Sequence, residues 1–222
     1  MSLGLPKGTV HGIVRTLVGV GFVEQDSDTG KYQLGAALPH LGASYLDVNE
    51  LRSRAINWAD ALAARSGEAV RIATLLDGRA LVVHHVFRPD DSVQTVGIGQ
   101  SLPAHACALG KVLLAYDRAA AVAAAGDLQP YTRRTLSTRA GLNPALIQVR
   151  ERGWAAEVEE MSMGVAGVAT AIRGQGGLVV GAIGISGAVD RVCDRSGAPR
   201  AVLVGQVQDA AREVSRELGH RW

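Results

Sequence analysis

Two β-forming runs joined by an Asp-Gly pair constrain the fold of this 222-residue chain more than any other feature. The runs are 70–76 and 80–86, and Asp77-Gly78 lies between them. A short loop of this type predicts a tight β-hairpin, because its backbone needs positive φ angles that Asp and Gly tolerate. The chain must therefore contain an antiparallel sheet.

Further strands and helices are predicted along the rest of the chain. Strands are expected over 92–97, 154–158, 167–173 and 178–186. Helices are expected over 36–65, 104–116, 118–125, 143–152 and 199–218, where apolar residues recur at helical spacing or proline and glycine mark an end. An antiparallel sheet with intervening helices on one face predicts an α+β domain.

The first forty residues follow a different pattern. Apolar residues recur at helical spacing up to Gly19, at Val10, Ile13, Val14 and Leu17. Two short runs, 22–25 and 31–34, then flank a turn rich in Asp and Gly and predict a second hairpin. A helix followed by a hairpin matches the C-terminal half of a winged helix-turn-helix.

The placement of charge on the first helix allows two interpretations. The formal net charge of the chain is +2, which is too small to identify a nucleic-acid partner. Off the apolar stripe, however, lie Lys7, Thr9, His11 and Arg15, and no acidic residue occurs between Met1 and Val23. This local patch suits contacts to phosphates and base edges. An ordinary amphipathic helix with two cations has the same spacing.

The cysteine content and hydropathy predict a cytoplasmic protein. Cys107 and Cys193 are isolated, which is typical of a reducing compartment. No apolar stretch approaches the roughly 18–20 residues needed to span a bilayer. The N-terminal sequence lacks the apolar core of a signal peptide. We therefore expect no membrane partner.

A loop that contains glycine precedes the predicted helix at 104–116. Free backbone N–H groups at a helix N-terminus favour an anionic ligand, although structural capping explains the same pattern. A phosphate-binding P-loop is excluded, because His105 and Val112 stand where that motif needs Gly and Ser or Thr. A zinc site with His105 and Cys107 lacks a second pair of ligands.

Three carboxylates lie close together at Glu157, Glu159 and Glu160. They could form an acid/base pair or bind a metal. Strand alternation places Glu157 and Glu159 on one face and Glu160 beyond the strand end, so a solvated strand edge is the simpler interpretation. His84 and His85 point to opposite faces of their strand and cannot chelate one ion together.

A serine nucleophile is not predicted at Ser186. The segment 182–187, AIGISG, departs from the GxSxG motif of hydrolases, because the second glycine, Gly187, follows Ser186 directly and so arrives one residue early. We therefore predict no catalytic residue, no metal and no cofactor.

Several of these segments resemble the IclR family of bacterial transcriptional regulators. Residues 4–42, GLPKGTVHGIVRTLVGVGFVEQDSDTGKYQLGAALPHLG, are similar to the family pattern GLPKSTVHRLLRTLxxxGYVxxDxxTGRYxLGxxLxxLG. The stretch that begins at Leu102 resembles LPxHAxAxGKAxLA, and the stretch after Gly153 resembles GYAxxxEExxxGVxxxAxPV. The strand at 182–187 resembles ALSVSGP, with Ala188 in place of proline. The similarity extends from Gly4 to about Leu218.

The resemblance implies two domains. Residues 1–42 would form a partial winged helix-turn-helix with the start of a linker, and 43–222 a GAF-like effector-binding domain with a curved antiparallel sheet. The family's DNA-contacting positions fall on Lys7, Thr9, His11 and Arg15. Gly12 stands where the family usually has an arginine. The family's domain begins with a helix and turn that this sequence lacks, so we expect an incomplete DNA-binding domain.

The resemblance also implies a small-molecule pocket. The family's usual contacts fall on Ala108, Leu109, Glu157, Gly167, Gly184 and Ser186. We expect N–H groups from Ala108 to Gly110 and the Ser186 hydroxyl to bind an anionic or hydroxylated group. Glu157 would accept hydrogen bonds from hydroxyls, which favours a polyol or hydroxy acid, and the two glycines would leave the pocket roomy.

The expected partners are operator DNA in the complete protein, a small-molecule effector, and further copies in a homodimer or homotetramer. Two alternatives remain open. One is a ligand-sensing dimerisation module that does not bind DNA. The other is a small-molecule enzyme that uses Glu157, Glu159 and Glu160 together with His105.

Overall fold

The computed structural model describes residues 6–25, 30–34, 37–90 and 92–220, and of residue 34 and residues 37–47 only the backbone. The chain divides into two compact units, Met1–Asn49 and Glu50–Trp222. The division lies inside helix α2 (Ala37–Ser66). The predicted boundary near Gly42 falls in the same helix and stays a prediction. Among the described helices, none is both long and apolar enough to cross a membrane.

The smaller unit contains the predicted helix and hairpin. Helix α1 (Lys7–Gly19) begins after Pro6, whose ψ of 142° is not helical. The chain then turns through Gly21, which has a φ of 75°. Strand β1 (Val23–Gln25) pairs antiparallel with β2 (Tyr32–Leu34). The helix and the two strands at the N-terminus are therefore confirmed, while the turn residues 26–29 lie outside the described part of the chain.

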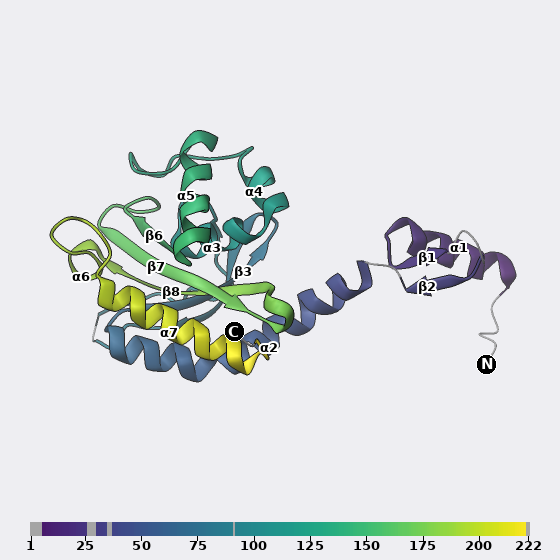
Figure 1. Cartoon of the computed structure of the whole chain (residues 1–222), viewed down its shortest axis with the longest axis horizontal. Helices are drawn as coiled ribbons and strands as arrows, with labels where there is room; N and C mark the ends of the chain where they lie inside the picture. Colours follow the sequence, from purple (N-terminus) through teal and green to yellow (C-terminus); the bar gives the residue numbers. More distant parts are fainter. Residues whose placement is uncertain (1–5, 26–29, 35–36, 91, 221–222) are drawn as a thin grey trace. The chain divides into compact units, whose positions relative to one another are not determined.

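The larger unit is built on one antiparallel sheet of six strands, in the order β5-β4-β3-β8-β7-β6 (Figure 1). The strands are β3 (Ala69–Leu76), β4 (Arg79–Val86), β5 (Ser101–Pro103), β6 (Trp154–Val158), β7 (Val165–Arg173) and β8 (Val179–Ala188). Asp77 and Gly78 have φ angles of 49° and 74°, which confirms the hairpin that the Asp-Gly pair predicts.

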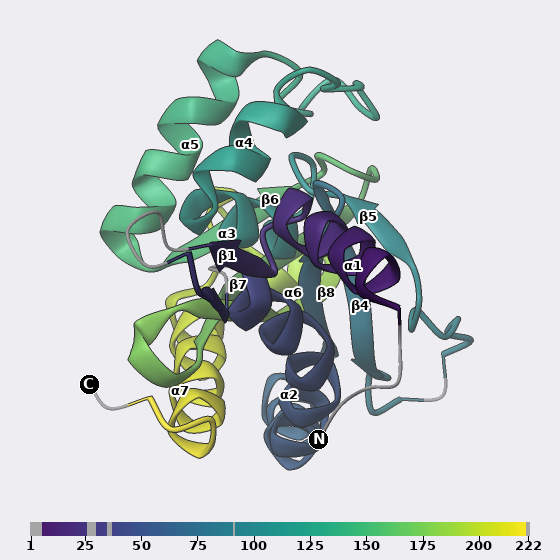
Figure 2. The same ribbon diagram turned by 90° about the vertical axis from the view of Figure 1, so that its right-hand side faces the viewer.

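Helices cover both faces of this sheet, not one (Figures 1 and 2). One face carries α3 (Ala108–Tyr116), α4 (Arg118–Ala124) and α5 (Arg139–Arg152). The opposite face carries α7 (Ala201–Glu217) beside α2, where Trp58 Nε1 donates a hydrogen bond to Glu217 Oε1 at 2.9 Å. The short helices α6 (Val189–Val192) and η1 (Gln175–Gly177) were not expected from the sequence.

The strand predicted at 92–97 is wrong, because these residues form no strand. The strand at this edge of the sheet is β5, which lies later in the sequence, shortly before α3. The loop is instead closed by its own polar groups. The Arg88 N–H donates to Gln94 Oε1 at 2.7 Å, and Gln94 Nε2 donates to the Arg88 carbonyl at 2.9 Å. Val93 is fully exposed, so its apolar side chain does not contribute to a core.

Two helices begin at positions other than those predicted, because a side chain caps each one. Helix α3 begins at Ala108 and not at Ala104, since Cys107 has an extended backbone and its sulfur accepts from Gly110 N. Helix α5 begins before Asn143, because Thr138 caps it by accepting from Gly141 N. Pro144 therefore lies inside α5 and not at its start.

One cluster of buried apolar side chains joins the sheet to α3 and α5. The strands contribute small residues, among them Ala73, Ala169 and Ala182. The helices contribute larger ones, such as Val112 and Leu146. Small residues on the sheet let the helices approach it closely. This face of the sheet also holds the candidate site.

Candidate functional site

The predicted site residues on the strands share one face of the sheet. Gly167 lies opposite both Ser186 and Glu157, and Gly184 lies opposite Arg71 and Ala169. Successive strand residues point to opposite faces, so these positions share the face of the buried alanines. The helix that packs on those alanines is α3. The site therefore lies between the sheet and the N-terminal end of α3.

The N-terminus of α3 is capped by Cys107. The Cys107 sulfur accepts a hydrogen bond from Gly110 N at 3.3 Å. Burial raises the pKa of this thiol to about 12, so the cap is neutral. The Gly110 N–H is thus occupied by the Cys107 sulfur, and the role of Gly110 in binding a ligand stays a prediction. Among the hydrogen bonds of the described residues, none uses the N–H groups of Ala108 or Leu109, which remain available as donors.

Gly110 has a packing role instead. A Cβ at Gly110 would lie 2.2 Å from the Cα of Ala104. Only glycine allows the first turn of α3 to lie this close to the preceding segment.

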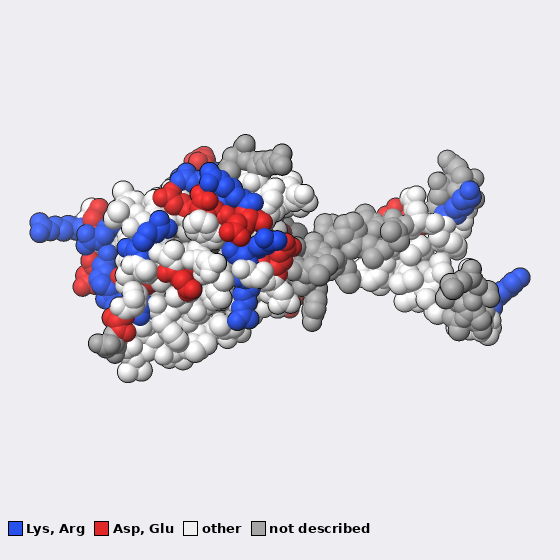
Figure 3. Space-filling model, turned by 90° about the horizontal axis from the view of Figure 1, so that it is seen from below, with Lys and Arg blue, Asp and Glu red and all other residues white. Residues whose placement is uncertain are grey.

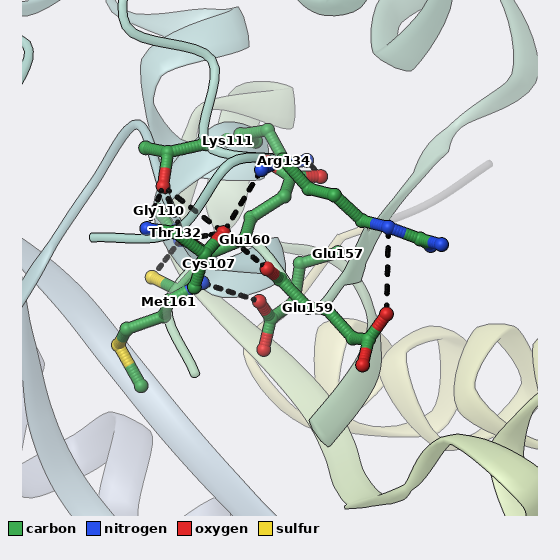
Figure 4. A network of polar contacts seen from close by, with 10 residues as sticks. Cys107, Gly110, Lys111, Thr132, Arg134, Glu157, Glu159, Glu160 and Met161 are labelled. Carbon is green, nitrogen blue, oxygen red and sulfur yellow. Dashed lines mark hydrogen bonds and ion pairs between the residues drawn. The ribbon is translucent and has the colours of Figure 1, made fainter. Parts of the chain in front are cut away.

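Glu157 is a buried carboxyl group. Its side chain leaves the residue only 4% exposed, and Glu157 Oε2 accepts from Met161 N at 3.3 Å (Figure 4). Burial raises the pKa of Glu157 to about 7. The carboxyl group of Glu157 therefore keeps its proton between about pH 4.5 and pH 7, where an exposed glutamate is ionised. This contradicts the interpretation of Glu157 as part of a solvated strand edge.

Glu160 is buried as well and pairs with a lysine of α3. Lys111 Nζ lies 2.6 Å from Glu160 Oε1 (Figure 4). The backbone around Glu160 is fixed by two threonines, because Thr132 Oγ1 donates to the Glu159 carbonyl at 2.5 Å and Thr135 Oγ1 to the Glu160 carbonyl at 2.6 Å. Glu160 Oε2 is buried without a hydrogen-bond partner.

The three carboxylates have different hydrogen-bond partners. Glu159 Oε1 accepts from Gly164 N at 2.9 Å, and Glu159 Oε2 lies 3.4 Å from Arg134 Nε. His105 Nε2 is bonded to the Gln129 carbonyl at 2.9 Å. The glutamates and His105 therefore do not form a shared acid/base group. Within the described residues, no three His, Cys, Asp or Glu side chains are grouped to hold a metal ion.

Arg71 and His85 belong to the same site and were missed in the sequence. Arg71 Nη1 donates to Ser186 Oγ at 2.9 Å. Burial lowers the pKa of Arg71, and it lowers the pKa of His85 to about 4. The available signal was a single arginine within the otherwise uncharged run 70–76. His84 precedes His85 in β4, so the two side chains point to opposite faces of the sheet, as the sequence predicts. His84 is also buried.

The two glycines of the site do not create space. A Cβ at Gly184 would lie 2.5 Å from the Val168 carbonyl oxygen, and one at Gly167 would lie 3.0 Å from the Ile185 carbonyl oxygen. Both positions are filled by the neighbouring strand. The expectation of a roomy pocket is therefore wrong at these positions, and the glycines serve the close approach of β7 and β8.

The predicted DNA-contacting side chains are all exposed on α1. Lys7, His11 and Arg15 follow one another at a spacing of four and share one side of the helix, whereas Thr9 lies across it. A Cβ at Gly12 would meet nothing within 4 Å. On the larger unit, the face in Figure 3 intersperses basic and acidic side chains, and α7 carries ion pairs such as Arg216 Nη1 with Glu213 Oε1 at 2.7 Å.

Two family models match this chain. Residues 43–216 match the C-terminal domain of bacterial IclR transcriptional regulators, and residues 2–27 match the IclR helix-turn-helix domain. The glycerol operon regulatory protein of Streptomyces coelicolor is 52% identical over 219 residues, which cover 98% of this chain and 86% of that protein. The glycerol operon regulatory protein of Streptomyces griseus is 48% identical with the same coverage.

Solved structures share the fold. A transcriptional regulator from Rhodococcus sp. RHA1 is 28% identical with a TM-score of 0.70, over 96% of this chain and 85% of that one. An IclR homologue from Microbacterium hydrocarbonoxydans, solved in complex with 4-hydroxybenzoate, has a TM-score of 0.70 at 22% identity, over 97% of this chain and 87% of that one. The predicted α+β fold with an antiparallel sheet is confirmed.

Proposed function

We propose that this chain, which belongs to the IclR family of bacterial transcriptional regulators, controls an operon for glycerol or a related polyol in response to a small hydroxylated metabolite. As a member of that family it is a DNA-binding regulator under small-molecule control and not an enzyme. The similarity to two glycerol operon regulatory proteins supports the proposed operon. The observation that carries the proposed effector class is the buried polar face between α3 and the sheet.

The polar groups on this face suit a ligand with hydroxyl groups. The N–H groups of Ala108 and Leu109 are donors without partners, and Glu157 offers a buried carboxyl that can accept from a hydroxyl. Ser186 Oγ already accepts from Arg71, so its own O–H remains to donate. A polyol or hydroxy acid can both donate to and accept from these groups. A purely apolar ligand would leave them unpaired at a cost of about 1–3 kcal/mol each.

A thermal-shift screen of glycerol, glycerate and glycerol phosphate tests the proposed effector class, followed by calorimetric titration of each compound that raises the melting temperature. Ser186→Trp should abolish binding, because the indole would fill the space before the sheet. Ser53→Trp is the matched control, since Ser53 is exposed on α2. If Ser186→Trp leaves the affinity of every positive compound unchanged, the assigned site is wrong.

On the smaller unit we propose that Lys7, Thr9, His11 and Arg15 contact operator DNA. Their exposure on α1 supports this assignment. Each phosphate contact made by a cation contributes about one unit to the slope of log affinity against log salt. Lys7→Ala and Arg15→Ala should each reduce that slope by about one unit in fluorescence anisotropy with promoter DNA. Arg52→Ala, an exposed change on α2, should leave it unaltered.

The assembly and location of the protein are also part of the proposal. The chain would act as a homodimer or homotetramer in the cytoplasm, where the chromosome is accessible to it. An isologous dimer presents two reading helices to a palindromic operator. Light scattering coupled to gel filtration measures the oligomeric state directly, and a monomer at micromolar concentration would contradict this assignment.

A further inference from the structure

The loop between β4 and β5 presents apolar side chains to solvent. It runs from Phe87 to Gln100, whereas hairpin loops usually span about 2–5 residues. The exposed large apolar side chains of this loop are those of Phe87, Val93, Val96 and Ile98. Val93 is the extreme case, because its side chain is fully exposed. A concentration of exposed apolar side chains in one segment is typical of a surface that contacts another molecule.

Polar contacts on both sides of Val93 fix the shape of this loop. On one side, Asp90 Oδ1 accepts from Ser92 N at 3.1 Å, and Asp90 also pairs with Arg88. On the other side, Gln94 Oε1 accepts from Arg88 N at 2.7 Å, and Gln94 Nε2 donates to the Arg88 carbonyl at 2.9 Å. We call residues 92–94 the tip of the loop. Because the tip is held in place before any partner binds, little conformational entropy is lost on binding.

A surface pocket of about 460 Å³ lies where the segment 131–134 meets the turn from β6 to β7. It is lined by Tyr131, Thr132, Arg133, Arg134, Glu159 and Met163. Met163 is 67% exposed and Tyr131 is 44% exposed, so both of these large side chains meet solvent. Tyr, Met and Arg are the residue types enriched where proteins contact one another. The pocket is separate from the effector site, because neither Glu157 nor Ser186 lines it.

The walls of this pocket are fixed by contacts between its two segments. Thr132 Oγ1 donates to the Glu159 carbonyl at 2.5 Å, and Arg134 Nε lies 3.4 Å from Glu159 Oε2 (Figure 4). Glu159 has a φ of 57°, which few residues other than glycine adopt. Gly164 N holds the side chain of Glu159 in this position by donating to Oε1 at 2.9 Å. The pocket is therefore formed before a partner arrives.

The pocket and the loop have opposite net charge. Arg133 is exposed, and within the described residues no carboxylate oxygen lies within 4.0 Å of its guanidinium. Because Glu159 pairs with the other arginine of the pocket, one positive charge remains there. The loop has Arg88 against Asp90 and Asp91, so it keeps one negative charge. An acidic loop with an apolar tip is thus complementary to a basic pocket with apolar walls.

We propose that the pocket receives the tip of a second copy of this chain, and that the pocket of the second copy receives the tip of the first. A two-fold axis makes such a contact reciprocal, because the same pair of surfaces meets twice. Val93 fills the apolar part of the pocket, and Arg133 attracts the negative charge of the loop. The inference rests on the proposed assembly, for which it names one surface, and it does not depend on the effector or on DNA.

Cysteine cross-linking between two differently substituted copies of the full chain tests this contact. Val93→Cys is made in one protein and Met163→Cys in the other, and the two are mixed, left to exchange subunits and treated with oxidised glutathione. We expect a disulfide-linked dimer on a non-reducing gel, because residues in contact reach the Cα separation of a disulfide, about 4–7 Å. Val93→Cys mixed with Val122→Cys is the matched control, since Val122 is exposed on α4 and does not line the pocket. The native thiols, Cys107 and Cys193, are buried.

Light scattering coupled to gel filtration, over a dilution series, gives a second measurement. Val93→Ser removes the apolar side chain without changing the charge and should raise the dissociation constant of the assembly by about tenfold or more. Arg133→Glu should have a similar effect, because it repels the acidic loop. Arg118→Glu makes the same change on α4, outside the pocket, and should assemble as the unaltered protein does. All three side chains are exposed, so the variants should fold.

The inference is overturned if the mixture of Val93→Cys and Met163→Cys gives no more linked dimer than the control mixture, or if Val93→Ser and Arg133→Glu assemble as Arg118→Glu does. A pocket that takes a small molecule or a different protein would give these results. An oligomer that survives both substitutions would leave the proposed assembly intact and place its interface elsewhere. Failure of the proposed function gives a different result, since the disulfide between positions 93 and 163 would form while the chain bound neither promoter DNA nor any polyol compound.

Discussion

The carboxyl group of Glu157 is 4% exposed, and its burial has a consequence for stability that can be measured. Its pKa in the folded protein is about 7, raised by burial from 4.5. Between these two values the folded state binds a proton that the unfolded state releases, so the free energy of unfolding falls as pH rises through this window. Above about pH 7 the loss amounts to roughly 3 kcal/mol.

Glu157→Gln should remove this dependence. We expect the variant to be more stable than the unaltered protein at about pH 8, by up to roughly 3 kcal/mol, and to differ little at about pH 4.5. Urea denaturation across this pH range measures the difference. Glu151→Gln, an exposed change on α5, is the control and should track the unaltered protein. Parallel pH profiles for Glu157→Gln and the unaltered protein would show that Glu157 is ionised in the folded state.

The buried pair of Lys111 and Glu160 gives a second residue-scale prediction. Lys111→Met leaves Glu160 buried without its partner at 2.6 Å and should destabilise the protein by about 3–5 kcal/mol. Adding Glu160→Leu removes the orphaned carboxylate and should recover most of the loss. Chemical denaturation of both single variants and the double variant measures the coupling. Additive effects would contradict a direct interaction.

At the scale of residues, the sequence predicts part of the site. The resemblance to a family placed Ala108, Leu109, Glu157 and Ser186, and the structure brings all four to one region. The role of Arg71 in the site could not be predicted. Apolar residues occupy both odd-numbered and even-numbered positions of the run 70–76, so the pattern does not reveal which face of the sheet the arginine occupies. The burial of Glu160 depends on Lys111, which is distant in sequence.

The strands β7 and β8 illustrate what a glycine contributes at the scale of an element. Gly184→Ala would place a Cβ 2.5 Å from a carbonyl of the neighbouring strand and should destabilise the larger unit by about 1–3 kcal/mol. Gly205 in α7 is the matched control, because a Cβ there meets nothing within 4 Å. Gly205→Ala should stabilise the protein by about 0.5–1 kcal/mol. Thermal and urea denaturation measure both changes. If the two substitutions changed the stability in the same direction, the packing role assigned to Gly184 would be wrong.

Local signals predicted most elements but not their ends. The Asp-Gly turn identified the β3–β4 hairpin, because its φ angles are a property of the turn itself. The start of α3 could not be predicted, since its cap is a cysteine, which seldom has this role. The apolar residues of 92–97 suggested a strand, but a strand needs a neighbour to pair with, and Gln94 closes this loop on Arg88 instead.

The chain as a whole joins a DNA-binding unit to an effector-binding unit through helix α2, which spans the division between Asn49 and Glu50. A regulator of this kind requires the two sites to be coupled in free energy. Coupling between binding sites is reciprocal, so an effector that changes the affinity for DNA by a given factor must have its own affinity changed by DNA by the same factor.

This reciprocity gives a prediction that connects Ser186 to the smaller unit. Whichever of glycerol, glycerate and glycerol phosphate binds should change the affinity for promoter DNA in fluorescence anisotropy, and saturating DNA should change the affinity for that compound by an equal factor in calorimetry. In Ser186→Trp the affinity for DNA without effector should be unaltered, because Ser186 belongs to the larger unit, while the response to effector should be lost. Lys7→Ala should show the reverse pattern, with weaker DNA binding and unaltered affinity for the effector alone. A change of DNA affinity in Ser186→Trp without any effector would mean that the substitution biases the conformation of the protein itself and does not act through the ligand.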